Sequence, residues 1–298
     1  MYQFPARLPL LAQDDAFTLP VAAAKKMKIG TRVEGEGPAV VLLHSSMASK
    51  SQWRTLMESM RGTHRLIAID LHGYGESAMP ESGGRHTLLD EVRLVQSKLA
   101  QVLAPGERFH LVGHSFGGGV ALRLAHANPD RVRSLTLFEP TAFHLLEPDH
   151  PALGEVCAIA HATQLGVIEG QRDEATGMFI DFWSGKGAYA ALPPARQALL
   201  ASLLDKVPLD FQALIDDPLR VADYGRMAVA ACLIAGSDSP PCAHAIVSVL
   251  AAFLANAETH EVDAGHMAPV SHPALVNPII EDFIRRIDGN GYIGADRI

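Results

Sequence analysis

Short apolar runs alternate along most of the chain with longer stretches whose apolar residues recur at helical spacing. Several of the apolar runs are continuous rather than alternating, which is typical of strands covered on both faces. Strands are predicted at residues 28–33, 39–43, 65–70, 109–112, 134–138, 230–235 and 259–262. Helices are predicted between most of them, at residues 52–60, 88–103, 118–127, 243–256 and 274–287. This alternation predicts an α/β fold with a mostly parallel, doubly wound sheet.

The alternation stops between residues 139 and 227, where no run predicts a strand. Prolines interrupt this stretch and separate helical pieces such as residues 195–204 and 210–214. We expect a helical lid at residues 140–227, inserted into a core of residues 28–139 and 228–298, with residues 1–27 as an N-terminal extension. Ligands bind at the carboxyl ends of the strands in such sheets, so a lid there would exclude water and shape a pocket. A structural subdomain without a gating role is the alternative.

The composition fits a globular protein with one large core, since 48% of the 298 residues are apolar and 19% are charged. A net charge of −8 repels phosphates, so neither nucleic acid nor an anionic membrane is an expected partner. Cys157, Cys232 and Cys242 form no C-x-x-C pair, which suits a reducing compartment and predicts no zinc site.

No apolar run reaches the roughly 18–20 residues that span a bilayer. The start of the chain also lacks the uninterrupted apolar region of a secretory signal. We therefore expect a cytoplasmic protein. Nothing in the pattern predicts an oligomeric state.

The stretch FHLVGHSFGGGVALRLA at residues 109–125 is the first candidate for chemistry. A strand pattern ends near Gly113, a helical pattern begins at Gly117, and Ser115 stands at the turn between them. Glycines tolerate the unusual dihedrals and the close chain approach that a sharp strand-to-helix turn demands. A serine in G-x-S-x-G at such a turn matches a nucleophile elbow. A phosphate-binding loop would end in Gly-Lys-Ser/Thr, and no lysine follows here.

A serine hydroxyl is a weak nucleophile that needs a base, and position selects His266 for that role. This histidine lies in DAGHMAP, directly after the last predicted strand. The glycine beside it lets the loop bring the imidazole over the sheet edge. We therefore expect Ser115 and His266 to meet at the carboxyl ends of the strands.

Four sequence blocks together resemble the α/β-hydrolase fold superfamily over residues 28–290. They are VVLLHSS at 40–46, DLHGYGES at 70–77, GHSFGG at 113–118 and GHMAP at 265–269. The order of serine first and histidine last also agrees with this family. The resemblance implies a Ser–His–acid triad, an oxyanion hole, a small-molecule substrate, and no metal or organic cofactor. A serine at the elbow argues against haloalkane dehalogenase or epoxide hydrolase chemistry, which this fold performs with an aspartate nucleophile.

The oxyanion loop departs from the family pattern, because His44-Ser45-Ser46 replaces the usual His-Gly. The donors in such a hole are backbone N–H groups, so loss of the glycine need not remove the hole. The resemblance assigns the donors to the N–H groups of Ser46 and Phe116. By the same resemblance, Asp70 and His44 are expected to brace loops rather than to act in catalysis.

The acid of the triad has two candidates. The family usually places it three residues beyond the glycine that follows the strand at 230–235, but Gly236-Ser237-Asp238-Ser239 puts serine in that slot and Asp238 one residue before it. The rival is Glu139, which follows the strand at 134–138, where some family members carry their acid. A carboxylate at the end of an apolar strand also needs a partner, because burying it unpaired is costly. We favour Glu139 and keep Asp238.

The resemblance and the residues together predict a serine hydrolase for a small, largely apolar carbonyl substrate, such as a carboxylic ester or a related acyl compound. Aromatic side chains of the expected lid, among them Phe143, Phe179 and Trp183, are candidates for lining its pocket. A carbon–carbon bond hydrolase of the same fold is one alternative. A ligand receptor of this fold with an impaired triad is the other.

Overall fold

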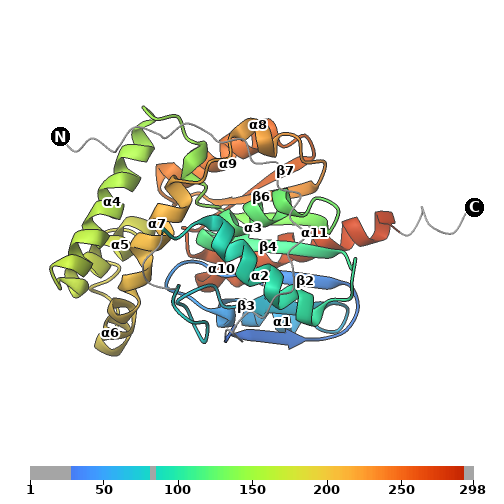
Figure 1. Cartoon of the computed structure of the whole chain (residues 1–298), viewed down its shortest axis with the longest axis horizontal. Helices are drawn as coiled ribbons and strands as arrows, with labels where there is room; N and C mark the ends of the chain where they lie inside the picture. The colour runs from blue at the N-terminus through green and yellow to red at the C-terminus, as the bar shows by residue number, and fades with distance from the viewer. Residues whose placement is uncertain (1–27, 81–84, 292–298) are drawn as a thin grey trace, which may run out of the picture.

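The computed structural model describes residues 28–80 and 85–291, and its centre is a seven-stranded sheet (Figure 1). The strands are β1 Thr31–Glu34, β2 Ala39–Leu43, β3 Arg65–Ile69, β4 Phe109–His114, β5 Val132–Phe138, β6 Ala230–Gly236 and β7 Ala257–Val262. They lie in the order β1-β3-β2-β4-β5-β6-β7, and each neighbouring pair is parallel except β1 with β3. The predicted α/β fold with a mostly parallel sheet is confirmed. The predicted extension at 1–27 lies outside the described residues.

Helices cover both faces of the sheet because the strands carry apolar side chains on both. In β2 all five residues are buried: Val41 and Leu43 belong to one apolar cluster, and Val40 and Leu42 to the other. The first cluster is completed by α2 Leu88–Val102, α3 Phe116–Ala127 and α9 Pro241–Phe253, and the second by α1 Arg54–Met60 and α11 Pro273–Gly291. Within the described ranges, none of the helices combines the length and the apolar character that crossing a bilayer requires.

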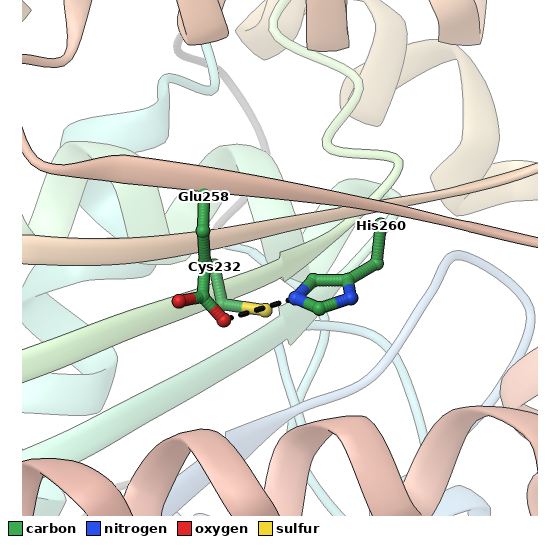
Figure 2. Close-up of side chains that lie close together, drawn as sticks. All are labelled: Cys232, Glu258 and His260. Atoms are coloured by element: carbon green, nitrogen blue, oxygen red, sulfur yellow. Dashed lines mark hydrogen bonds and ion pairs between the residues drawn. The ribbon is translucent and has the colours of Figure 1, made fainter.

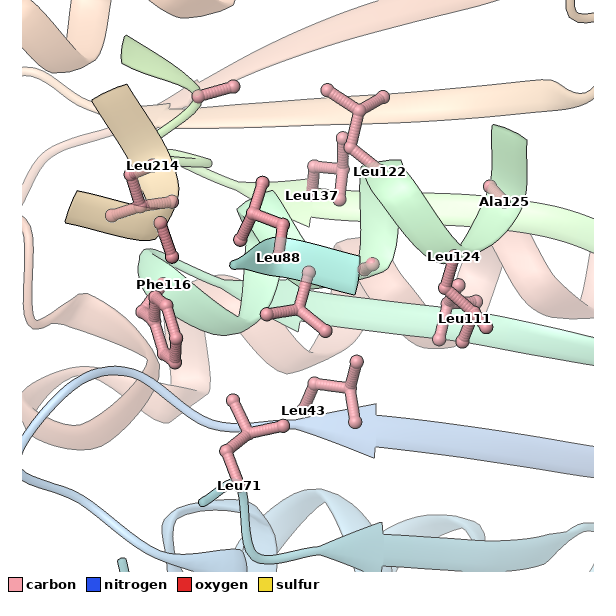
Figure 3. Packing of buried hydrophobic residues seen from close by; sticks show 14 of the residues in the cluster. Leu43, Leu71, Leu88, Leu111, Phe116, Leu122, Leu124, Ala125, Leu137 and Leu214 are labelled. Carbon is pink, nitrogen blue, oxygen red and sulfur yellow. The ribbon is translucent and has the colours of Figure 1, made fainter. Parts of the chain in front are cut away.

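Figure 3 shows part of the first cluster, in which leucines of three adjacent strands meet the covering helices. Leu43, Leu111 and Leu137 come from β2, β4 and β5, and none of the three is exposed to solvent. Burying one leucine side chain contributes about 1.5–3 kcal/mol, so this layer is a main source of stability. It also fixes the strand ends from which the candidate catalytic loops emerge.

Helix α2 begins where its sequence provides a cap. The Thr87 hydroxyl accepts from the Asp90 N–H at 3.3 Å, and the Asp90 carboxylate accepts from the Thr87 N–H at 3.0 Å. This reciprocal pair is a capping box, which satisfies two donors that the first turn of a helix leaves free. The helix ends at Val102, one residue before the predicted end.

The long interval between β5 and β6 is helical, and we call residues 143–224 the helical segment. It consists of η2 Phe143–Leu145, α4 Pro151–Ile168, α5 Arg172–Ser184, α6 Pro194–Ser202, η3 Leu204–Lys206, α7 Val207–Ile215 and α8 Val221–Tyr224. Prolines stand in the first turns of α4, α6 and α7, where their missing N–H costs nothing. In Figure 1, helices α4, α5 and α6 stand together beside the sheet.

A buried cluster of charges ties the helical segment to the body. Lys206, at the start of α7, donates from Nζ to Glu91 Oε1 of α2 at 3.0 Å and to Asp210 Oδ1 of α7. Glu91 also accepts from His86 Nε2 at 2.8 Å. We call Lys206, Glu91 and Asp210 the Lys206 ion cluster; all three are at most 2% exposed.

The pKa values in this cluster reflect its burial and its pairing. Burial alone would raise the pKa of Glu91, but Lys206 and the bond from His86 bring it down to about 2. Burial would lower the pKa of Lys206, whereas the Asp210 and Glu91 carboxylates raise it above its ordinary value. Both groups are therefore charged at neutral pH, and each needs the other, because an unpaired buried charge is costly.

The depressed pKa of Glu91 predicts a specific loss of stability in acid. A carboxyl whose pKa is lower in the folded state stabilises the protein above its unfolded pKa, near 4.5, and this contribution disappears as the pH falls toward about 2. The free energy of unfolding, measured with urea at several pH values, should therefore fall more steeply between pH 4.5 and 2 in the wild type than in Glu91→Gln. At pH 7 the variant should be less stable by roughly 3–5 kcal/mol, because Lys206 loses a partner. Equal slopes in the two proteins would contradict the assignment.

Candidate active site

The turn at Ser115 has the geometry that its glycines predict. β4 ends at His114, α3 begins at Phe116, and Ser115 lies between them with φ 55° and ψ −120°. A Cβ on Gly117 would lie 2.4 Å from the carbonyl oxygen of His44, and one on Gly113 would lie 2.5 Å from that of Gly117. Any larger residue at these two positions would push the strand and the helix apart. The turn therefore holds Ser115 in a strained conformation through close packing on both sides.

Three side chains from distant parts of the sequence meet at this turn. His266 Nε2 lies 2.9 Å from Ser115 Oγ, and His266 Nδ1 lies 2.6 Å from Glu139 Oε2. A carboxylate can only accept, so Nδ1 carries the proton and Nε2 is left to accept from the serine hydroxyl. Ser115 is 6% exposed, His266 2% and Glu139 0%. The structure thus brings together the predicted nucleophile, the predicted base and the favoured acid.

Glu139 directly follows β5 and is held by two backbone groups of the neighbouring strand β6. Its N–H donates to the carbonyl of Ile234 at 3.0 Å, and its Oε1 accepts from the N–H of Gly236 at 2.6 Å. Burial alone would raise the pKa of Glu139, but the hydrogen bonds from His266 and Gly236 lower it below its ordinary value. The carboxylate therefore stays ionised and is ready to stabilise a positive imidazole. Its φ of 43° is a second strained non-glycine conformation at this site.

Asp238, the other candidate acid, lies away from the imidazole contact. Its side chain is exposed, and its backbone N–H donates to the carbonyl of Ala264 at 3.1 Å. The reason lies in the strand before it, because β6 continues through Gly236, whose N–H is occupied by Glu139. The carboxyl that reaches His266 is the one directly after β5, and not the one on the loop after β6.

A chain of hydrogen bonds connects the histidine loop with the oxyanion loop. His114 Nε2 donates to the carbonyl oxygen of His266 at 2.9 Å, and its Nδ1 accepts from Gln52 Nε2 at 3.1 Å. Gln52 Oε1 in turn accepts from the N–H of Ser45 at 3.1 Å. Burial lowers the pKa of His114 well below its ordinary value, so the ring stays neutral and can play both parts. Sequence reasoning missed Gln52 and assigned no role to His114.

Trp183 of α5, a candidate for lining the pocket, also packs on the candidate base. Its ring stacks on that of His266 with centroids 4.1 Å apart and planes inclined by 26°. The indole thus limits rotation of the imidazole and shields its face from water. No local sequence signal identifies this contact, because it depends on how α5 folds back over the sheet.

The two predicted oxyanion donors stand on different elements near Ser115. Phe116 is the first residue of α3, so its N–H belongs to the first turn, whose donors have no acceptor within the helix. Ser46 lies in the loop after β2, and its hydroxyl donates to Asp210 Oδ2 at 2.6 Å. The loop makes its left-handed bend at Met47, with φ 56°, and Ser45 has no such conformation. This explains why the loop tolerates serine where the family usually has glycine.

Asp70 and His44 brace loops, as expected. Asp70 Oδ1 accepts from the Lys50 N–H at 2.6 Å, and its Oδ2 accepts from Lys50 Nζ at 2.7 Å and from the Glu76 N–H at 2.9 Å. His44 Nε2 accepts from the Leu71 N–H at 3.0 Å, and Nδ1 donates to the Ser45 carbonyl at 2.8 Å. Through these hydrogen bonds, Asp70 and His44 join the oxyanion loop to the loop after β3.

A small cavity opens beside Ser115, between the sheet edge and the helical segment. It has a volume of about 10 Å³, which is room for roughly one water molecule. Its walls are Ser46, Ser115, Thr141, Phe143, Phe179, Trp183, Val207, Asp210, Phe211 and Leu214. A larger hollow of about 590 Å³ is lined by the opposite ends of the strands, including Val132 and Ala230, and is not part of this site.

A separate group of potential metal ligands lies on β6 and β7 (Figure 2). One ligand atom from each of Cys232, Glu258 and His260 lies within 4.8 Å of the others. His260 Nε2 donates to Glu258 Oε1 at 2.9 Å, and Arg286 donates to the same oxygen at 2.6 Å. Burial raises the pKa of the Cys232 thiol to about 12. The positive charge of Arg286 and the protonated thiol of Cys232 both oppose metal binding. We therefore interpret the contact between Glu258 and Arg286 as an ion pair, and not the group as a metal site.

Comparison with known proteins finds a matching family model and several proteins of similar sequence. A family model described as the alpha/beta hydrolase family matches residues 40–279. A haloalkane dehalogenase of Agrobacterium fabrum is 34% identical over 114 residues, 38% of this chain and 36% of that protein. A pimeloyl-(acyl-carrier protein) methyl ester esterase of Nitrosomonas europaea is 35% identical over 117 residues, 39% of this chain and 43% of that protein. The chain thus aligns with less than half the length of these curated relatives.

A solved structure supports the same fold over nearly the whole chain. A hydrolase from Pseudomonas aeruginosa superposes with a TM-score of 0.72 and covers 91% of this chain and 99% of that chain. The two sequences are 21% identical in this alignment, so the likeness concerns the fold alone.

The contact between Glu139 and His266 can be tested without any substrate. A proton held between an imidazole nitrogen and a carboxylate gives a proton NMR resonance far downfield. Glu139→Gln should abolish this resonance or move it upfield, because a neutral amide is a weaker acceptor than a carboxylate. Asp238→Asn, the matched control on the other candidate acid, should leave it in place. Loss of the resonance in Asp238→Asn alone would contradict the arrangement described.

Proposed function

The chain belongs to the alpha/beta hydrolase family, and from this premise we propose that it is a serine hydrolase that cleaves small, largely apolar carbonyl substrates, namely carboxylic esters or related acyl compounds. The observation that carries the proposal is the continuous line of hydrogen bonds from Ser115 through His266 to Glu139. The line ends at a serine on a strained turn that faces a cavity.

The proposed reaction proceeds in two halves. His266 Nε2 takes the proton of Ser115 as Oγ attacks the carbonyl carbon, and Glu139 stabilises the imidazolium that results. The N–H groups of Ser46 and Phe116 receive the oxyanion, and each such donor is worth about 10²–10³ in rate. The proton passes from His266 to the leaving alcohol, which departs and leaves the acyl group on Ser115. Water then attacks this ester by the same route in reverse, releasing the acid and the free serine.

The chemistry of a serine nucleophile restricts the substrate class. Attack on a carbonyl carbon gives an ester, which water can hydrolyse. Attack on a haloalkane carbon would give an ether, which the same machinery cannot release. A carbonyl substrate is therefore favoured, although one relative is named a haloalkane dehalogenase. A carbon–carbon bond hydrolase also needs a carbonyl at the cleavage site, and it remains the alternative within this class.

Backbone strain supports an enzyme over a ligand receptor. Met47, Ser115 and Glu139 are the non-glycine residues with positive φ in the described part of the chain, and they belong to the oxyanion loop, the elbow and the acid position. Such conformations cost about 1–3 kcal/mol each and persist where the surrounding structure enforces them. The strain coincides here with the hydrogen bonds that join Ser115, His266 and Glu139, which a protein that only binds a ligand does not require.

The helical segment is proposed to act as the lid of this site. Phe143, Phe179, Trp183 and Phe211 come from this segment and close the cavity over Ser115. The cavity is too small for an acyl group in this conformation, so substrate entry requires part of the segment to move. The apolar walls favour an acyl chain without a charge.

Ser115 is tested by its removal. Ser115→Ala should lower the hydrolysis of 4-nitrophenyl esters by at least 10³-fold, because no other group can form the acyl-enzyme. The protein should also lose labelling by a fluorophosphonate probe. Ser97→Ala, at an exposed position on α2, is the matched control and should keep both properties. Unchanged hydrolysis in Ser115→Ala with the fold intact would refute the proposal.

The acid is tested by kinetics on the same esters. Glu139→Gln should lower kcat by roughly 10³–10⁴-fold, because the amide no longer fixes the tautomer of His266 or stabilises its positive charge. Asp238→Asn should remain within about threefold of the wild type, since Asp238 is exposed and apart from the imidazole. The opposite ranking of the two variants would transfer the role to Asp238.

A further inference from the structure

The cavity beside Ser115 is apolar on most sides, but Thr141 is a polar exception. This residue follows Glu139 and Pro140 at the end of β5, and it is 2% exposed. Its backbone N–H donates to the carbonyl of Ser115 at 3.1 Å, which fixes it beside the nucleophile. Its hydroxyl is buried and has no hydrogen-bond partner in the described part of the chain. Thr141 therefore lines the cavity while its hydroxyl has bonding capacity that no described residue uses.

An unpaired buried hydroxyl needs an explanation, because most such groups in proteins are satisfied. Two other threonines, Thr136 and Thr176, have hydroxyls that are also buried without a partner among the described residues. Neither of them lines the cavity beside Ser115, whereas Thr141 does. Thr141 lines the cavity, where a ligand can satisfy it, and Thr136 of β5 offers a comparison with a threonine that does not line the cavity.

Asp210 is the second polar group on this wall that can bind a ligand. Its carboxylate accepts from the Ser46 hydroxyl at 2.6 Å, from the Tyr74 hydroxyl at 2.5 Å and from Lys206 Nζ. A carboxylate has about four acceptor positions, so these three bonds leave one for a ligand. The Lys206 ion cluster holds α7 against the body, which keeps Asp210 at the cavity wall when other parts of the segment move.

The two groups together define the kind of ligand that fits. Asp210 can only accept a hydrogen bond when ionised, whereas the Thr141 hydroxyl can donate one. A hydroxyl on the ligand does both, since it donates to the carboxylate and accepts from the threonine. Thr141 and Asp210 both line the same small cavity beside Ser115. The Lys206 ion cluster already contains two carboxyls against one ammonium, so an anionic ligand would meet repulsion.

We propose that the acyl group of the substrate carries a single uncharged hydroxyl near the carbonyl, and that Thr141 and Asp210 bind this hydroxyl. The substrates are then esters or thioesters of short hydroxy acids whose remaining surface is apolar. This proposal rests on the proposed serine hydrolase function and names its substrate class.

The test compares esters that differ in one group. 4-Nitrophenyl butyrate, its 2-hydroxy and 3-hydroxy derivatives and the 4-nitrophenyl monoester of succinic acid are hydrolysed by the wild type, after correction for spontaneous hydrolysis. At least one hydroxy ester should exceed butyrate in kcat/KM by tenfold or more, and the succinate ester should fall below butyrate. Thr141→Val, which has the same shape without the hydroxyl, should reduce the preference for the hydroxy ester to threefold or less.

Two further variants make the result specific. Thr141→Ser keeps a hydroxyl and should keep the preference, whereas Thr141→Ala also removes the hydroxyl and takes the place of Thr141→Val if the latter does not fold. Thr136→Val removes an unpartnered hydroxyl on β5, away from the cavity, and should leave the preference unchanged. Equal kcat/KM for butyrate and both hydroxy esters would overturn the substrate class, as would loss of the preference in Thr136→Val. Absence of any Ser115-dependent hydrolysis on all four esters would instead refute the proposed function itself.

Discussion

The bond between the carboxylate of Glu139 and the imidazole of His266 is the interaction around which this site is built. It spans 2.6 Å and joins residues that are 127 positions apart in the sequence. The second carboxylate oxygen takes the N–H of Gly236, so one side chain fastens the ends of β5 and β6 and the loop after β7. A misplacement of any of these three ends would separate Ser115 from its base. The sheet must therefore be complete before the site exists.

Around this bond, each loop at the sheet edge is tied to its neighbour by a group that has no chemical role in the proposed reaction. His114 and Gln52 connect the histidine loop to the oxyanion loop, and Asp210 connects the oxyanion loop to α7. Hydrogen bonds of this kind are strong in a buried setting and lock side chains into a single arrangement. Preorganisation in the proposed mechanism is thus a property of several loops acting together and not of the three central residues alone.

The sequence was sufficient for the sheet and for most of the covering helices, and for a physical reason. Strand β2 was predicted with its observed bounds because both of its faces are buried, which leaves an uninterrupted apolar run. Helices α4 and α5 were not predicted individually, because apolar residues on α4 are distributed around the helix, and several, such as Leu165 and Ile168, are exposed. Within the site, Ser115 and His266 followed from local motifs. The choice between Glu139 and Asp238, and the stacking of Trp183, depend on tertiary placement that no local pattern carries.

The three left-handed residues at the site set a limit on how this protein can adapt to heat. Met47, Ser115 and Glu139 each hold an unfavourable backbone conformation in the folded state. Glycine at Ser115 or Glu139 would relieve the strain there, but it would also remove the hydroxyl or the carboxylate that the proposed chemistry uses. Greater thermal tolerance must therefore come from elsewhere, for example from surface turns and helix caps remote from the sheet edge. Such changes would raise the melting temperature while leaving the strained residues at the edge of the sheet unchanged.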